Sequence, residues 1–198
     1  MTLEEKIGQM VACRYSGNFV NKNSEYFQNL NTLIQKQKIG GLIIFGGAVY
    51  ETAILNNTFQ ELADIPLLIA SDFERGAGNQ IDGAILFPPL MSLGAADSED
   101  LAYMMGKITA LEGRALGIHM TYAPVVDVNI NPDNPIINTR SIGEKPEQVG
   151  RIGQAFIKGC QDYGLIATAK HFPGHGDTDL DSHSVLPNIE ADRERLDT

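Results

Sequence analysis

Fourteen consecutive residues near the end of the chain gather side chains that can bind metals or transfer protons. The segment 170–183, KHFPGHGDTDLDSH, contains three histidines, three aspartates and one lysine. Pro173, Gly174 and Gly176 disfavour a regular helix, so we expect this segment to form a loop. Such a loop is a candidate metal site, a candidate acid/base site, or a turn without a catalytic role.

The metal alternative rests on the histidines and aspartates, which could supply nitrogen and oxygen ligands. The histidine spacing lacks the H-E-x-x-H form, and the alternating aspartates lack the glycine and final glutamate of a calcium-binding loop. The turn alternative has a simple basis, since Asp and Gly are common in loops for conformational reasons. We expect no metal here.

Acid/base chemistry fits the end of the segment better. Asp181 and His183 are two residues apart, so a turn can let the carboxylate hold one imidazole nitrogen while the other faces a substrate. An imidazole with a pKa of about 6.5 can protonate a leaving group and later accept a proton from water. Asp181 and His183 are therefore the predicted acid/base pair.

Repeated helix-then-strand patterns precede and support this loop. Apolar residues at helical spacing are followed by near-continuous apolar runs, which is typical of parallel strands buried by helices. An additional short helix begins at Thr2, where Glu5 completes a capping box. The predicted strands are LIIFGG (42–47), PLLIASDFE (66–74), HMTYAPVVDVN (119–129) and LIATAKHF (165–172), each preceded by a predicted helix.

Polar residues at the ends of these strands distinguish two α/β folds. FGGAVYE, after the first predicted strand, does not match the G-x-G-x-x-G of a dinucleotide-binding sheet. Barrel enzymes collect their active sites at the carboxyl ends of several strands. Three strand ends carry polar pairs in this way: Asp72 with Glu74, Asp127 with Asn129, and Lys170 with His171. The predicted fold is α/β, a TIM (β/α)8-type barrel.

The length of the chain limits how much of such a barrel it can form. Eight strands and their helices typically need ~250 residues, whereas about four strands are predicted here. We therefore expect residues 1–198 to form a single catalytic (β/α) barrel domain, truncated at its C-terminal end and covering the N-terminal half or slightly more.

Composition excludes several classes of partner. Fifteen basic and 25 acidic residues give a net charge of -10, which disfavours binding to nucleic acid. No apolar run approaches the ~20 residues of a membrane span, and no signal peptide is evident. Localisation stays open between the cytoplasm and export with the signal removed, and the oligomeric state is not predicted. Cys13 and Cys160 fall in helical patterns and are predicted core positions.

The loop sequence closely resembles the signature of the family 3 glycoside hydrolases, in their β-N-acetylglucosaminidase branch. Lys-His, Pro-Gly-x-Gly and a later Asp-x-His recur in that branch at the spacing seen in KHFPGHGDTDLDSH. The segments EEKIGQM, IASDFERG, TYAPVVDVN and NTRSIGEKPEQV also agree with the family. The resemblance covers nearly the whole chain.

This resemblance implies roles for five substrate-binding residues. Asp72 matches the sugar-binding aspartate, whose carboxylate suits a pair of pyranose hydroxyls. Lys170 and His171 match the pair that contacts the glycone. Arg140 matches an arginine lining the same subsite, and Asp127 resembles a residue at the floor of the pocket.

The resemblance also implies the catalytic groups and exposes two departures. Asp181 and His183 match the family's acid/base dyad. The second-strand motif is commonly Asp-Gln-Glu-Gly-Gly, whereas this chain has Asp-Phe-Glu-Arg-Gly, so Arg75 either replaces a binding arginine or alters the outer subsite. The family nucleophile is an aspartate on a later strand, expected beyond residue 198.

The implied activity is a retaining hydrolysis that releases terminal β-linked N-acetylglucosamine without a cofactor. The implied substrates are carbohydrates, in particular peptidoglycan fragments. The isolated chain is expected to lack normal turnover, because its nucleophile is missing. The alternatives are a β-glucosidase of the same family, a catalytically silent sugar-binding protein and a metal-dependent hydrolase. Asp181 and His183 favour the acetamido-sugar branch, since β-glucosidases generally use a carboxylic acid from elsewhere.

Overall fold

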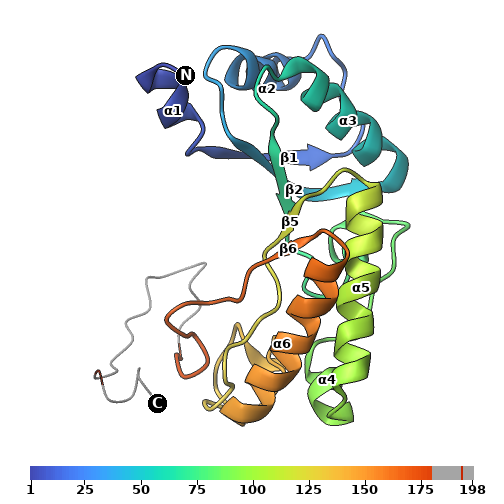
Figure 1. Ribbon diagram of the computed structural model, residues 1–198, viewed down its shortest axis with the longest axis vertical. Helices are drawn as coiled ribbons and strands as arrows, with labels where there is room; N and C mark the ends of the chain where they lie inside the picture. The colour runs from blue at the N-terminus through green and yellow to red at the C-terminus, as the bar shows by residue number, and fades with distance from the viewer. Residues whose placement is uncertain (180–192, 194–198) are drawn as a thin grey trace.

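The computed structural model describes residues 1–179 and residue 193, and its centre is a parallel sheet with helices on the outside (Figure 1). The sheet consists of β1 (Ala12–Gly17), β2 (Gly41–Ala48), β3 (Leu68–Ser71), β4 (Ile81–Asp82), β5 (Met120–Thr121) and β6 (Ile166–Ala167). Its order is β1-β2-β3-β5-β6, with β4 paired to β2, and every pairing is parallel. Within the described residues the sheet does not close into a barrel.

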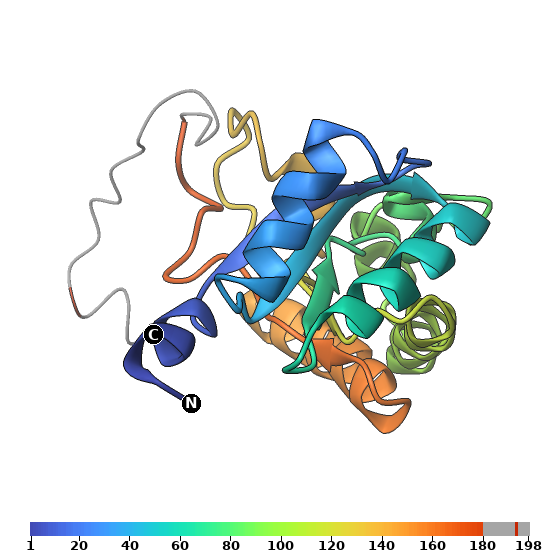
Figure 2. The ribbon, with the colours of Figure 1, turned by 90° about the horizontal axis from the view of Figure 1, so that it is seen from above.

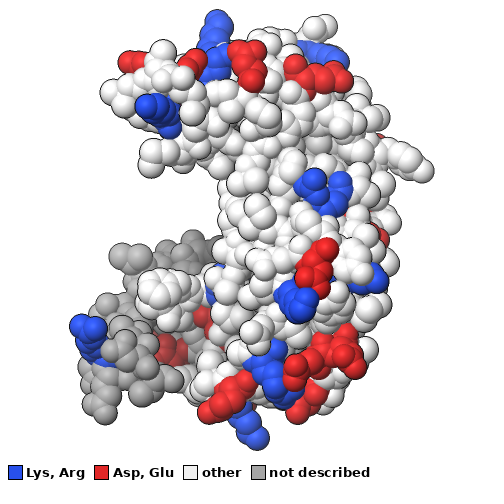
Figure 3. All heavy atoms as spheres, in the orientation of Figure 1, with Lys and Arg blue, Asp and Glu red and all other residues white. Residues whose placement is uncertain are grey.

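The helices follow the strands in the expected alternation. They are α1 (Leu3–Gly8), α2 (Glu25–Gln35), α3 (Val49–Leu62), α4 (Met91–Ala96), α5 (Glu99–Ala115) and α6 (Pro146–Asp162), with 3-10 turns η1 (Ala77–Asn79) and η2 (Asn138–Arg140). Figure 2 shows α2 and α3 lying across β1 and β2. Figure 3 shows that the molecule curves around a hollow on the side opposite α5. The parallel strands, ordered as in the sequence and covered by helices on the outside, confirm the predicted α/β barrel class, of which the described residues form an open part.

Local signals account for the helix starts. Ser98 caps α5 by accepting a hydrogen bond from the backbone N–H of Leu101, and Pro146 occupies the first turn of α6. The side chain of Thr2 and that of Glu5 form the predicted capping box at α1. Each of these caps depends on residues within one helical turn, which is why the capping box at Thr2 could be predicted from the sequence.

Strand β1 was not predicted, and this is a correction. The sequence ACRYSG has no continuous apolar run, since Arg14 and Ser16 alternate with buried Tyr15 and Gly17. Residues 12–15 pair with β2 in continuous parallel register. The buried Tyr15 packs edge-to-face against Phe59 of α3, a contact distant in sequence, so periodicity within β1 alone gave a weak signal.

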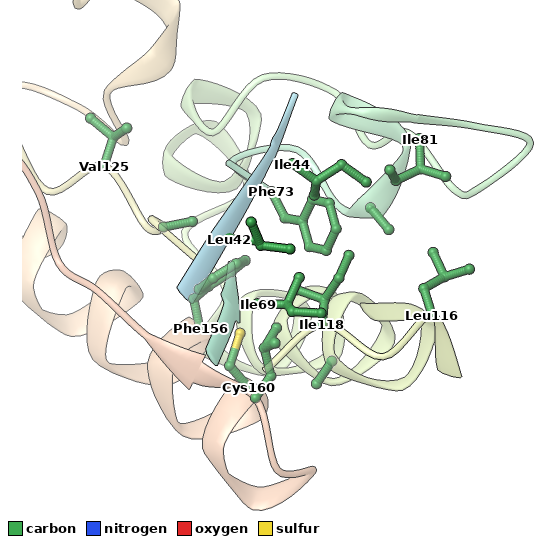
Figure 4. Close-up of a cluster of buried hydrophobic side chains, with 14 of the residues drawn as sticks. Leu42, Ile44, Ile69, Phe73, Ile81, Leu116, Ile118, Val125, Phe156 and Cys160 are labelled. Atoms are coloured by element: carbon green, nitrogen blue, oxygen red, sulfur yellow. The ribbon is translucent and has the colours of Figure 1, made fainter. Parts of the chain in front are cut away.

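The core joins the sheet to the outer helices. Leu42 and Ile44 from β2, Ile69 from β3 and Phe156 from α6 are all fully buried (Figure 4). Side chains from the sheet and from α6 thus meet in one continuous apolar interior.

The two cysteines belong to this core. Cys160 in α6 is fully buried, and burial raises the pKa of its thiol to about 12. Cys13 is a free cysteine that packs against the same core while partly buried. It lies in strand β1 and not in a helix, which corrects the predicted element while the predicted core position is confirmed.

Helices α5 and α6 pack closely because two glycines lie where they meet. A Cβ atom on Gly106 would lie 2.2 Å from the backbone oxygen of Phe156, and one on Gly159 would lie 2.2 Å from that of Tyr103. Only glycine permits this approach of the two backbones. Among the described residues, no helix is long and apolar enough to cross a membrane.

Candidate active site

The loops that follow β3, β5 and β6 carry the predicted site residues, and backbone hydrogen bonds hold these loops together. Beyond β6, the backbone N–H of Lys170 donates to the oxygen of Pro124, and its own oxygen accepts from the N–H of Val126. This pairing brings Asp127 next to His171. The buried Ser141 hydroxyl donates to the backbone oxygen of Asp127 at 2.7 Å, which ties the Arg140 turn to the same place.

Lys170 lies between two carboxylates of the β3 loop. Its Nζ is 2.8 Å from Asp72 Oδ1 and 2.6 Å from Glu74 Oε1. The side chains of Lys170 and Glu74 are only 15% and 12% exposed, whereas that of Asp72 is 23% exposed. Such partial burial strengthens the ion pairs relative to surface pairs. The ammonium group is thus held in place with its neighbour Asp72 still reachable from solvent.

Glu74 joins Lys170 to Arg140. Arg140 donates from Nε to Glu74 Oε2 at 3.0 Å and from Nη2 to Glu74 Oε1 at 2.8 Å, a bidentate pair. Burial alone would raise the pKa of Glu74, but the hydrogen bonds from Arg140 and the charge of Lys170 outweigh it and lower the pKa to about 2. Glu74 is therefore ionised and shared by two cations.

Arg140 also faces His171, with Nη2 3.4 Å from His171 Nε2. The hydrogen bonds that Arg140 donates to Glu74 raise the pKa of Arg140 and outweigh its burial, with the charges of Glu74, Asp127 and Asp72 adding to the effect. Its remaining Nη1 donates to the backbone oxygen of Ile136. The guanidinium is thus fixed on both sides.

Asp127 lies beneath His171. Its side chain is fully buried, and its Oδ2 is 2.6 Å from His171 Nδ1, while the imidazole remains 33% exposed. Asp127 therefore forms the base of the cluster, and His171 separates it from solvent.

The segment after His171 is braced by its neighbours. Asn134 donates from Nδ2 to the backbone oxygen of His175 at 2.7 Å, and Thr178 Oγ1 hydrogen-bonds His175 Nδ1. A Cβ atom on Gly176 would lie 1.8 Å from the backbone oxygen of Val128, so glycine is required there. His175 is buried, and its contacts serve to hold the loop in place.

One predicted site residue stands apart from this cluster. Arg75 directs its Nε to the backbone oxygen of Phe87 at 3.0 Å, so that hydrogen bond anchors the returning loop. Asp181 and His183 lie outside the described residues. Glu74 was absent from the predicted site residues, although its place two residues after Asp72 at a strand end was a usable signal.

The cluster presents a set of donors and acceptors suited to hydroxyl groups. Asp72 offers carboxylate oxygens, while Lys170, Arg140 and His171 offer nitrogens of fixed position. In residues 1–179 and 193, no group of three or more His, Cys, Asp or Glu side chains is arranged to hold a metal ion. The chemistry of the cluster suits recognition of a polar, hydroxyl-rich ligand.

Comparison with known proteins gives concordant results. Residues 2–198 match the family model described as the glycosyl hydrolase family 3 N-terminal domain. Beta-hexosaminidase A of Pseudoalteromonas piscicida is 39% identical over 180 residues, covering 84% of this chain and 30% of that protein. A beta-N-acetylglucosaminidase/beta-glucosidase of Cellulomonas fimi is 34% identical over 180 residues, covering 91% of this chain and 31% of that protein.

A solved structure is similar over the whole chain. It is a glycoside hydrolase family 3 beta-N-acetylglucosaminidase from Paenibacillus sp., with 41% sequence identity and a TM-score of 0.90. The match covers 100% of this chain and 38% of that one. The chain thus spans about a third of the length of each of these three proteins.

Proposed function

We propose, since the chain belongs to glycosyl hydrolase family 3, that it forms the sugar-binding part of an enzyme that releases terminal β-linked N-acetylglucosamine. The observation that carries this proposal is the cluster of Lys170, Asp72, Glu74 and Arg140 at the carboxyl ends of the strands. A parallel-sheet enzyme binds its substrate at that edge. The names of the relatives support the acetamido sugar.

The mechanism proposed for the complete enzyme is a retaining double displacement. An aspartate beyond residue 198 attacks the anomeric carbon while protonated His183, oriented by Asp181, gives its proton to the departing glycosidic oxygen. The aglycone leaves as an alcohol, and a glycosyl ester remains on the enzyme. Neutral His183 then takes a proton from water, whose oxygen attacks the anomeric carbon and releases the sugar and the carboxylate. This scheme needs no cofactor.

In the first step, the described cluster would hold the glycone. Asp72 would accept hydrogen bonds from sugar hydroxyls, while Lys170, Arg140 and His171 contact the oxygens around the ring. Arg75 would act only at an outer subsite. We propose peptidoglycan fragments as the substrate class, and residues 1–198 as part of a single (β/α)8-type barrel domain.

The first experiment compares release of nitrophenol from aryl β-N-acetylglucosaminide and aryl β-glucoside, with the protein produced from its complete reading frame. We expect preference for the acetamido sugar, and a loss of about 100-fold or more in kcat for His183→Ala. Lys158→Ala is the control, because Lys158 pairs with Asp162 on the outer surface of α6. That variant should retain the activity.

Other outcomes would contradict specific parts of the proposal. Preference for glucose would reject the acetamido-sugar branch, and turnover that is indifferent to His183→Ala would reject the acid/base assignment. Saturable binding of N-acetylglucosamine without turnover would identify a sugar-binding protein instead.

A further inference from the structure

Asp127 is the most deeply buried charged group of the site, and both its oxygens bind one short segment. Its Oδ1 accepts from the backbone N–H of His175 at 2.6 Å, and its Oδ2 accepts from that of His171 at 3.2 Å. Oδ2 also lies 2.6 Å from His171 Nδ1. With its side chain 0% exposed, Asp127 has no surface to offer a substrate.

These contacts determine which imidazole nitrogen carries the proton. Both oxygens of Asp127 accept hydrogen bonds from backbone N–H groups, as those of a carboxylate do, and a carboxylate cannot donate. A nitrogen 2.6 Å from Oδ2 must therefore be the donor, so Nδ1 of His171 carries the hydrogen. In the neutral ring Nε2 is then left with a lone pair.

The surroundings of Nε2 agree with this assignment. Nε2 lies 3.4 Å from Nη2 of Arg140, a group that can only donate. A hydrogen on Nε2 would place two hydrogen-bond donors face to face, whereas a lone pair on Nε2 can accept a hydrogen bond from the guanidinium. The partly exposed imidazole can offer the same lone pair to an incoming hydroxyl.

We propose that Asp127 is a positioning residue that keeps His171 in the Nδ1–H tautomer, so that Nε2 accepts a hydrogen bond from a hydroxyl of the bound sugar. This role of Asp127 goes beyond that of a residue at the floor of the pocket. It makes His171 a hydrogen-bond acceptor beside the donors Lys170 and Arg140. The inference rests on the proposed function for its sugar ligand and for its kinetic consequence. The tautomer itself can be measured without turnover.

Asn134 provides a matched control. Like Asp127 it is buried and it braces the same segment, donating from Nδ2 to the backbone oxygen of His175 and accepting at Oδ1 from the N–H groups of Ile136 and Ile137. These hydrogen bonds do not involve the imidazole of His171. A merely structural role for Asp127 predicts similar behaviour of Asp127→Asn and Asn134→Ala, whereas control of the tautomer predicts a difference.

The decisive experiment is ¹⁵N NMR of the histidine side chains in the complete protein at about pH 8, where an ordinary imidazole is neutral. The His171 signals are assigned by their absence in His171→Gln. We expect the Nδ1–H pattern in the wild type and in Asn134→Ala, and a shift toward the Nε2–H pattern in Asp127→Asn. The Nε2–H pattern in the wild type would overturn the proposal even if Asp127→Asn and Asn134→Ala do not fold.

Kinetics supply the second readout. Asp127→Asn should lower kcat/KM for the aryl β-N-acetylglucosaminide by roughly 10- to 100-fold, by analogy with the carboxylates that orient metal-binding histidines. Thermal unfolding of the two variants shows whether their losses of stability are comparable. An unchanged tautomer in folded Asp127→Asn, or equal kinetic losses in the two variants, would reject the positioning role. An inactive wild type with the Nδ1–H pattern would reject the proposed activity and leave the tautomer assignment standing.

Discussion

Glu74 shows how one side chain can organise two others. Its carboxylate receives two hydrogen bonds from Arg140 and contacts Lys170, all at low exposure. Removing the negative charge leaves two cations close together without their shared partner. Such a loss is costly because neither cation can be fully rehydrated in place.

We therefore expect Glu74→Gln to lower the free energy of unfolding by about 3 kcal/mol. The control is Glu99→Gln, since Glu99 pairs with Arg151 on the surface and is 56% exposed. An exposed pair of this kind contributes about 0–1 kcal/mol. Urea unfolding of both variants measures the difference. Equal losses would show that the Glu74 cluster is no stronger than a surface ion pair.

The same residue predicts a dependence on pH. The pKa of Glu74 is about 2 in the folded chain, below its ordinary value of 4.5, so folding favours the ionised form. Its stabilising contribution is complete above pH 4.5 and is lost as the pH falls toward 2. Between these values, wild-type stability should fall more steeply than that of Glu74→Gln, as measured by unfolding at stepped pH. Parallel curves for the two proteins would contradict the lowered pKa.

At the scale of elements, α6 has one face that packs against α5 and one that faces solvent. Gly159 belongs to the first face and Gly150 to the second, where a Cβ atom would meet nothing within 4 Å. The two glycines lie in the same helix, so they share the intrinsic cost of glycine. Because their surroundings differ, substitutions at the two positions separate the effect of helix propensity from the effect of packing.

Gly159→Ala should destabilise the protein by about 1–3 kcal/mol, because the added methyl group meets the backbone of Tyr103 and forces the helices apart. Gly150→Ala should instead stabilise it by up to ~1 kcal/mol through helix propensity. Thermal unfolding of the two variants checks both signs. A stabilising Gly159→Ala would show that α5 and α6 are free to separate.

At the scale of the whole molecule, the curved sheet brings distant parts of the chain to one edge. Asp72 and Lys170 are 98 residues apart in sequence, and Glu74 and Arg140 are 66 apart, yet each pair is in contact. Parallel strands make this possible, because their carboxyl ends all point the same way. The hollow in Figure 3 lies on the side of the molecule opposite α5.

Local chemistry explains what the sequence determined alone. The capping box at Thr2 and the buried strands before Asp72 and Lys170 depend on neighbours a few residues away, so both could be predicted from the sequence. The family signature added the prediction of the glycone contacts, since it records residue types at fixed spacing. The broad class of fold followed from the alternation of helices and strands.

Only the tertiary structure decided how these residues share their charges. Nothing near Glu74 in the sequence indicates that Arg140 and Lys170 will both bind it, and nothing near Asp127 indicates that it will be fully buried beneath His171. Arg75 likewise finds its partner at Phe87 only when the loop folds back. These contacts depend on backbone positions set by the packing of the whole sheet, and spacing along the chain does not encode them.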